Sequence, residues 1–306
     1  MSEVFEAISE NEGESFSEPI GIFIEGNELD LSLSEQETFL PAMSGRVLEP
    51  VEKIGLKRTA TNSTALAEKN RFGLDEFALS RKSLISTTRV VTLNPDRVAP
   101  HLITLQELPS PEAEQQYRRL AVGLITAALD RPFKRVLFTS AQHGEGRTSV
   151  VLNLAGTLAR AKKRVLVIDT DFVRPSVMRL LGLDSEVGIA EVFTHDARLE
   201  DAAITILPLG FTVLVTREAI DSPAEILASA EFQELLNLLE QDFDFILFDS
   251  PPLLDSADAN LLTRMVDTTL LVIRPGKTST TQMAKAVAML DREDISGVVL
   301  NRVPKR

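Results

Sequence analysis

A glycine-containing loop with one cation and one hydroxyl is the segment with the clearest chemistry. Residues 141–149 read Ala-Gln-His-Gly-Glu-Gly-Arg-Thr-Ser and lie between an apolar run and a helical pattern. Against the phosphate-loop pattern G-x-x-x-x-G-K-[ST], Gly146 and Thr148 match, whereas Ala141 stands at the first Gly and Arg147 at the Lys. Glycines let backbone N–H groups turn inward, and the start of a helix adds partial positive charge. The segment is therefore predicted to bind phosphate.

Carboxylates follow two other apolar runs and are predicted to face this loop. One run ends in Asp169-Thr-Asp171 and another ends in Asp249. The carboxyl ends of parallel strands meet at one edge of a sheet, where ligands bind. Thr148, Asp171 and Asp249 are predicted to hold Mg²⁺, and Asp169 or Asp171 to orient a nucleophile. Because a single Asp at a strand end is also a common helix cap, the prediction depends on the whole group.

The remaining candidates for nucleotide binding lie in the loop and at the end of the last apolar run. Asn301 could present its amide to a nucleotide base, although a turn-forming Asn explains that position almost as well. His143 could act as a base or be a solvated side chain near bound phosphate. The predicted nucleotide-binding residues are Gln142, His143, Gly144, Glu145, Gly146, Arg147, Thr148, Ser149 and Asn301.

Short apolar runs alternate with helical patterns from about residue 110 onward. Because these runs lack polar and apolar alternation, they are predicted to be strands buried on both faces. The alternation predicts an α/β fold, with a mostly parallel sheet flanked by helices. The predicted strands are 135–140, 164–169, 210–215, 244–249, 268–273 and 297–301, with 89–94 and 102–105 as shorter candidates. The predicted helices are 113–129, 148–161, 223–240, 257–265 and 279–291.

The N-terminal part of the chain differs from the rest in charge and in hydrophobic patterning. Residues 1–40 carry many Asp and Glu but no Lys or Arg, and residues 41–100 show no sustained periodicity. Residues 1–88 are therefore predicted to be an acidic, mostly disordered tail and linker, and residues 89–306 a P-loop nucleotide-binding domain. Apolar residues at 20–24 leave open a short partner-binding element.

Composition excludes several classes of protein. The 306 residues are 44% hydrophobic, carry a formal net charge of -13 and include no Cys. The absence of Cys removes disulfides, thiol catalysis and Cys-bound metal, and the acidic balance argues against a nucleic-acid partner. No run approaches the roughly 18 apolar residues that a membrane-spanning helix needs, and the acidic N-terminus does not resemble a signal peptide. A cytoplasmic location is expected.

Together these motifs resemble the bacterial tyrosine kinases, or BY-kinases, a branch of the MinD/ParA-like P-loop ATPases. The resemblance covers about residues 89–306 and depends on segments 113–120, 139–148, 165–171, 221–227, 242–252 and 298–302. It implies an ATP and Mg²⁺ site built from the loop with Asp169, Asp171 and Asp249. It also implies a ring-forming or dimeric assembly, and a membrane-embedded, Wzz-like polysaccharide co-polymerase as partner. A partner of that kind would hold the chain at the membrane.

Departures from the family pattern affect the catalytic site. Arg147 stands where the family has Lys, and a planar guanidinium differs from an ammonium in reach and geometry. Val173 stands where the family's second Asp motif has Arg, with Arg174 next to it. The Walker A site is therefore expected to be degenerate, as in a pseudokinase, with Asp169, Asp171 and Arg147 as the candidate catalytic residues.

Further departures affect assembly and self-phosphorylation. The family's oligomerisation helix carries Glu-x-x-Arg-x-x-Arg, but Gln115, Arg118 and Ala121 stand at those positions. The family's tyrosine cluster is not seen after the last run, and Tyr117 is the only Tyr. Autophosphorylation of a tyrosine tail is therefore not expected, and Tyr117 is predicted to pack on the domain rather than serve as a phosphosite.

Three functions remain open on this evidence. The first is a nucleotide-binding BY-kinase-like protein with impaired catalysis that acts in exopolysaccharide or capsule biosynthesis or export. The second is an active protein-tyrosine kinase or ATPase that acts on a partner protein. The third is a MinD/ParA-type positioning ATPase, which the absence of a Lys in residues 141–144 disfavours.

Overall fold

The computed structural model describes residues 22–25, 88–106, 111–194, 197–290 and 295–303. Nine strands form one sheet in the order β1-β9-β8-β3-β7-β4-β6-β5-β2. Every strand pair is parallel except β5 with β6, which is antiparallel. The strands are β1 Ile22–Glu25, β2 Arg89–Thr92, β3 Arg135–Ser140, β4 Val165–Asp169, β5 Ala203–Leu207, β6 Phe211–Leu214, β7 Phe245–Asp249, β8 Thr268–Ile273 and β9 Ile295–Val303. The predicted α/β class and its mostly parallel sheet are confirmed.

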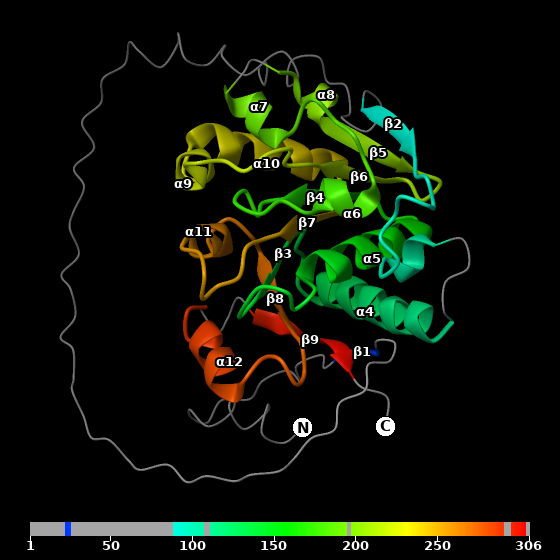
Figure 1. Ribbon diagram of the computed structural model, residues 1–306, viewed down its shortest axis with the longest axis vertical. Helices are drawn as coiled ribbons and strands as arrows, with labels where there is room; N and C mark the ends of the chain where they lie inside the picture. Colours follow the sequence, from blue (N-terminus) through cyan, green and yellow to red (C-terminus); the bar gives the residue numbers. More distant parts are fainter. Residues whose placement is uncertain (1–21, 26–87, 107–110, 195–196, 291–294, 304–306) are drawn as a thin grey trace, which may run out of the picture.

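Helices cover both faces of this sheet (Figure 1). The helices α4 and α5 lie on one face, and α10, α11 and α12 lie on the other. The helices are α4 Pro111–Asp130, α5 Arg147–Arg160, α6 Val177–Leu181, α7 Ile189–Thr194, α8 Leu199–Ala202, α9 Pro223–Leu227, α10 Ala230–Asp242, α11 Asp258–Thr263 and α12 Thr280–Val287. None of the described helices combines the length and the apolar character that crossing a membrane would require.

Successive residues of the central strands enter different hydrophobic clusters, because side chains alternate between the faces of a strand. In β3, Val136 and Phe138 pack in the cluster that includes α5, whereas Leu137 packs with α10. In β4, Val167 and Ile168 divide in the same way. Burial on both faces explains why these strands read as continuous apolar runs rather than alternating ones.

The structure corrects the expected elements at several places. Residues 102–105, expected as a strand, include a 3₁₀ turn at Ile103–Leu105, because the Thr104 N–H and hydroxyl bond to Asn153 of α5 instead of to a strand. The single helix expected over 223–240 is two, since Ser229 caps a new helix by accepting from Phe232 N (3.1 Å). The strand β5 and the helices α6, α7 and α8 were not predicted.

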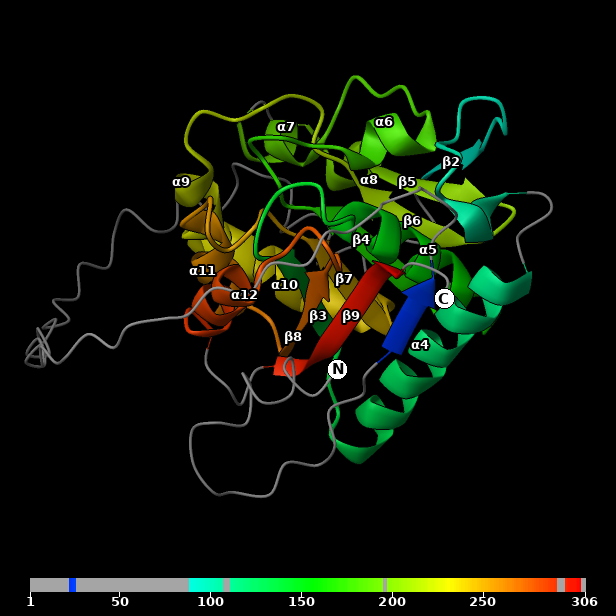
Figure 2. The same ribbon diagram turned by 60° about the horizontal axis from the view of Figure 1, so that its bottom comes forward.

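The N-terminal segment contributes one described element, the strand β1. It pairs in parallel with β9 at the edge of the sheet and lies beside α4 (Figure 2). These four residues fall within the segment expected to be mostly disordered, at the apolar positions for which a short binding element was the alternative. The rest of residues 1–87 lies outside the described residues, so the boundary at 88/89 stays a prediction.

Candidate functional site

The phosphate loop lies at the centre of the sheet, between the end of β3 and the start of α5. Gly144 (φ +78°) and Gly146 (φ +91°) both adopt left-handed backbone conformations, which glycine reaches without steric cost. Gly146 is also the N-cap residue of α5, so the unpaired N–H groups of the first helical turn face the loop. The strand, loop and helix predicted from the sequence are therefore present, with β7 and β8 flanking β3.

The side chain of Arg147 lies inside the site and is only 7% exposed. Its terminal nitrogens donate to Ser140 Oγ (2.7 Å) and to Asp171 Oδ2 (3.1 Å). The guanidinium therefore forms a buried ion pair with Asp171 at the ends of β3 and β4. A buried pair of this kind is costly to break, because either partner left alone is an uncompensated charge.

The carboxylates that follow β4 are engaged by this chain's own groups. Asp169 Oδ2 accepts hydrogen bonds from Ser176 N and Val177 N, both at 3.0 Å, at the start of α6. Asp171 Oδ1 accepts from Arg174 N at 3.1 Å, and its other oxygen contacts the guanidinium described above. The helix-capping alternative considered for a single Asp fits the contacts of Asp169.

Asp249, the last residue of β7, is a buried carboxylate with little compensation from the rest of the chain. It lies beside Asp169 in the strand register and is 1% exposed. Within the described residues, neither of its oxygens forms a hydrogen bond of standard geometry, and the Thr148 hydroxyl acts on it only as a weak donor. Burial raises the pKa of Asp249 to about 6, and the positive charge of Arg147 limits that rise. Such a group is costly unless a proton or a cation neutralises it, so this position is suited to a cation.

The hydroxyl of Thr148 lies near these carboxylates. It shares a hydrogen bond of 2.8 Å with Ser176 Oγ and also opposes the rise in the pKa of Asp249. No cluster of three or more His, Cys, Asp or Glu suited to a metal occurs in the part of the chain that is described. Magnesium sites often use only one or two protein carboxylates together with substrate phosphates. The arrangement of Thr148 and Asp249 fits that kind of site.

Residues that follow β8 brace the phosphate loop from the side opposite to β7, and the sequence analysis missed them. The fully buried Glu145 carboxylate accepts from Gln142 N (2.9 Å) and from the Thr278 hydroxyl. Lys277 Nζ donates to the backbone oxygen of His143 at 2.6 Å. The only sequence signal was a short polar stretch after a predicted strand, which does not identify a partner more than a hundred residues away.

Asn301 also contacts the loop. Its amide donates to the backbone oxygen of Glu145 at 2.8 Å, and its side chain would clash with a Cβ at Gly146. In the structure Asn301 therefore supports the loop backbone. Its contact with a nucleotide base stays a prediction. Ser149, the last predicted loop residue, lies in the first turn of α5, where its backbone oxygen accepts from Asn153.

A cavity of about 420 Å³ opens at the mouth of the site, lined by His143, Asp171, Val173, Arg174, Pro251, Asp255 and Ser256. His143 Nε2 lies 3.8 Å from Asp255 Oδ2. Burial and the charges of Arg147 and Arg174 lower the pKa of His143, so its imidazole is neutral at pH 7. The space is large enough for a phosphate-bearing ligand or an acceptor side chain.

Tyr117, on α4, is 2% exposed. Its phenol oxygen accepts from Asn153 Nδ2 at 3.3 Å, and burial raises the pKa of its hydroxyl. The prediction that this residue packs on the domain is confirmed by its burial. A kinase could reach its hydroxyl only after local unfolding.

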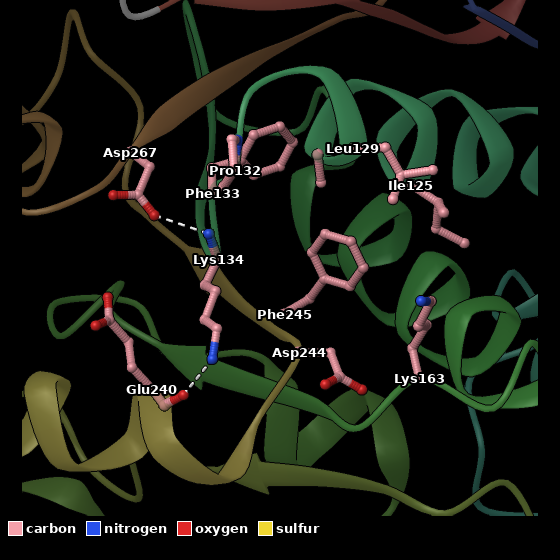
Figure 3. Close-up of a pocket in the computed structure, with 11 residues that line it drawn as sticks. Ile125, Leu129, Pro132, Phe133, Lys134, Lys163, Glu240, Asp244, Phe245 and Asp267 are labelled. Carbon is pink, nitrogen blue, oxygen red and sulfur yellow. Dashed lines mark hydrogen bonds between the residues drawn. The ribbon is translucent and has the colours of Figure 1, made fainter.

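A second cavity, of about 380 Å³, lies at the opposite edge of the sheet (Figure 3). It is formed by the C-terminal end of α4, by residues that precede β3, β4, β7 and β8, such as Phe133, and by Phe245 at the start of β7. Here Lys134 donates its backbone N–H to Asp267 and its ammonium to the backbone oxygen of Glu240. The charged groups of this cavity thus tie the beginnings of the strands together.

Comparisons with known proteins agree with this architecture. The AAA domain family AAA_31 matches residues 134–293. The tyrosine-protein kinase YwqD of Bacillus subtilis is 34% identical over 207 residues, which cover 67% of this chain and 87% of YwqD. The putative tyrosine-protein kinase AmsA of Erwinia amylovora is 27% identical across 84% of this chain, but the match spans only 34% of AmsA.

Solved structures give the same result. The kinase domain of the Escherichia coli tyrosine kinase ETK superposes with a TM-score of 0.64 at 27% identity, covering 69% of this chain and 82% of that domain. The VpsO kinase domain superposes with a TM-score of 0.57 at 31% identity, covering 62% of this chain and 96% of that domain. The family model, the curated relatives and the solved structures therefore agree, and the chain belongs to the BY-kinase family of MinD/ParA-like P-loop ATPases.

Proposed function

We propose that this chain binds Mg·ATP at the phosphate loop and acts, with impaired phosphoryl transfer, in exopolysaccharide or capsule biosynthesis or export. The observation that carries nucleotide binding is the buried Asp249 carboxylate, whose oxygens form no hydrogen bond of standard geometry among the described residues. It lies at the sheet edge where the loop supplies backbone N–H groups. A cation would neutralise the Asp249 carboxylate, and a phosphate bound to that cation would accept hydrogen bonds from the loop N–H groups.

The residues present fit magnesium and a nucleotide. Asp249 and the Thr148 hydroxyl are the ligands that we assign to Mg²⁺, with Asp171 as a further acceptor. The N–H groups of residues 142–149 are assigned to the phosphates. When bound, Mg²⁺ supplies positive charge that neutralises the phosphate oxygens. The chain's own contribution is then to hold the phosphates by its backbone and to keep water away from the buried carboxylates.

Impaired transfer is supported by how the candidate catalytic groups are used. Arg147 is paired with Asp171, and Asp169 accepts from two N–H groups of α6. Moving Arg147 onto a phosphate would leave Asp171 as a buried carboxylate without its cation. Backbone binding of phosphate does not require that movement. Binding with slow or no transfer is therefore the function that this geometry favours.

The cellular role and partner rest on family membership. A BY-kinase-like chain would act on or beside a membrane-embedded polysaccharide co-polymerase, which would hold it at the membrane, and homo-oligomers are part of the same proposal. Copurification with the co-polymerase of the same organism would test the partner. Loss of surface polysaccharide on deletion of the gene would test the pathway.

The test of the binding function is calorimetric titration with ATP and ADP, with and without Mg²⁺. Wild type is expected to bind Mg·ATP, and Asp249→Asn to lose the contribution of Mg²⁺. The rate of phosphoryl transfer from labelled ATP to a tyrosine-containing partner is then compared between wild type and Arg147→Lys. A faster variant would show that residue 147 limits transfer. Absence of nucleotide binding by wild type and by Arg147→Lys would show that the site assignment is wrong.

An active kinase or ATPase that acts on a partner is the second candidate. The open cavity at the mouth, next to Arg174, favours it because an acceptor side chain could enter there. Transfer of labelled phosphate by wild type at a rate equal to that of Arg147→Lys would favour this candidate over impaired transfer.

A further inference from the structure

The buried part of the phosphate site contains more negative than positive charge. Glu145, Asp169, Asp171 and Asp249 are buried there, and Arg147 is the one buried cation among the described residues of the loop and these strand ends. That cation is already paired with Asp171. A nucleotide would add further negative charge, of which the proposed Mg²⁺ would neutralise a part, so a further cation at the loop would favour binding.

Lys277 is a cation placed at the loop from outside. It follows β8, the neighbour of β3 on the side away from β7, and its side chain is exposed. Its ammonium donates to the backbone oxygen of His143 at 2.6 Å. An ammonium has three N–H donors, and that bond uses one of them. The described contacts leave its other donors unused.

The Lys277 ammonium packs closely against Gly144. A Cβ at that position would meet the ammonium, which is the flexible end of its side chain and could move aside. The firm requirement for glycine is the left-handed backbone conformation of Gly144. The ammonium therefore lies directly against the turn of the phosphate loop.

The turn that carries Lys277 is itself held against the loop. Lys277 N and Thr278 N both donate to the Arg274 backbone oxygen at 3.0 Å, and the Thr278 hydroxyl donates to the Glu145 carboxylate. Directly after it, Ser279 caps α12 in a reciprocal capping box with Gln282. These contacts position the Lys277 backbone without help from a nucleotide.

We infer that Lys277 supplies the cation that contacts the polyphosphate of the bound nucleotide, in place of Arg147. This inference rests on the proposed nucleotide binding. Lys277 approaches from the β8 side, and Arg174 lines the mouth on the β4 side. The Lys that faces the phosphates would then come from the turn after β8 and not from the phosphate loop itself.

The experiment compares Lys277→Gln with the matched control Lys285→Gln, which removes an exposed Lys on α12. Each variant is titrated with ATP, ADP and AMP in the presence of Mg²⁺. Lys277→Gln is expected to weaken ATP binding about 10- to 100-fold, the usual size of a charged hydrogen bond, with a smaller loss for AMP. Lys285→Gln is expected to bind like wild type.

Equal ATP affinity of Lys277→Gln and wild type would overturn the inference while leaving the proposed function intact. An equal loss for ATP and AMP would also overturn it, because Lys277 would then contact the nucleoside part. If wild type binds no nucleotide, the proposed function and the inference both fail. Unchanged thermal unfolding of Lys277→Gln, expected for an exposed side chain, excludes misfolding as the cause of a loss.

Discussion

The amino edge of the central sheet satisfies its carboxylates within the chain, whereas the carboxyl edge leaves one, Asp249, largely uncompensated. At the amino edge, Asp267 accepts from Lys134 N and Arg135 N, both at 2.8 Å (Figure 3). At the same edge, Asp244 accepts from Arg164 N and from the Arg164 guanidinium. At the carboxyl edge, the Asp249 oxygens form no hydrogen bond of standard geometry among the described residues. Asp267 and Asp244 are hydrogen-bonded within the chain, as expected for carboxylates with a structural role. The buried Asp249 carboxylate is not, and this difference marks the ligand site.

The pKa values show the same contrast. Burial disfavours the ionised form of Asp244, but the hydrogen bonds from Arg164 outweigh it and lower the pKa of that carboxyl. Burial raises the pKa of Asp249 to about 6, because the opposing groups are too weak. Ionised Asp244 therefore stabilises the fold, whereas ionised Asp249 destabilises it until a cation binds.

The largest expected effect comes from replacing Asp249. At pH 7, Asp249→Asn is expected to raise the free energy of unfolding of the ligand-free protein by up to about 3 kcal/mol, since the pKa moves from 3.8 to about 6. Urea denaturation measures this change. In saturating Mg·ATP this advantage of Asp249→Asn should shrink or reverse, because wild type gains more from the ligand than the variant, which lacks the contact with Mg²⁺. A less stable ligand-free Asp249→Asn would contradict the comparison.

The pH dependence of that difference sharpens the comparison. Below about pH 3, Asp249 is protonated in both the folded and unfolded states and resembles Asn. As the pH rises from about 3 to 6, the unfolded state loses the proton first, so wild type loses stability relative to Asp249→Asn. The difference in the free energy of unfolding should be near zero below about pH 3 and constant above about pH 7. A difference in unfolding free energy that becomes smaller as the pH rises would contradict this prediction.

A change at the amino edge should have the opposite sign. Asp267→Ala removes the acceptor of two backbone N–H groups at the start of β3 and is expected to lower the free energy of unfolding by about 2 kcal/mol. Denaturation of Asp267→Ala and Asp267→Asn compares the two cases. Asp267→Asn keeps one acceptor oxygen and should lose less. Equal losses would mean that charge, rather than hydrogen bonding, holds this edge.

The smallest effect is expected for Asp244→Asn. This substitution should lower the free energy of unfolding by about 1 kcal/mol, because it weakens a partly exposed pair with Arg164. The loss should shrink in 1 M salt, where surface ion pairs are screened. The same chemical change, Asp to Asn, would then stabilise one edge and destabilise the other. A stabilising Asp244→Asn would remove the distinction between the edges.

The fold and the position of the site were predictable from local patterns. The apolar runs identify the buried strands because burial on both faces removes alternation, and the glycines of the loop identify the turn between β3 and α5. The convergence of Asp169 and Asp249 follows from parallel pairing of β4 with β7, which aligns the two residues in register. Short elements such as β5 and α8 were missed because they join directly and leave no turn signal between them.

The sequence by itself determined the residue types at the loop and the edge of the sheet where they meet. Only the tertiary structure decided what each side chain does there. Arg147 pairs with Asp171, Asn301 supports the loop backbone, and Lys277 reaches the loop from after β8. The physical reason is that strand and turn patterns are local, whereas the partner of a buried charge is chosen by contacts between segments far apart in the chain.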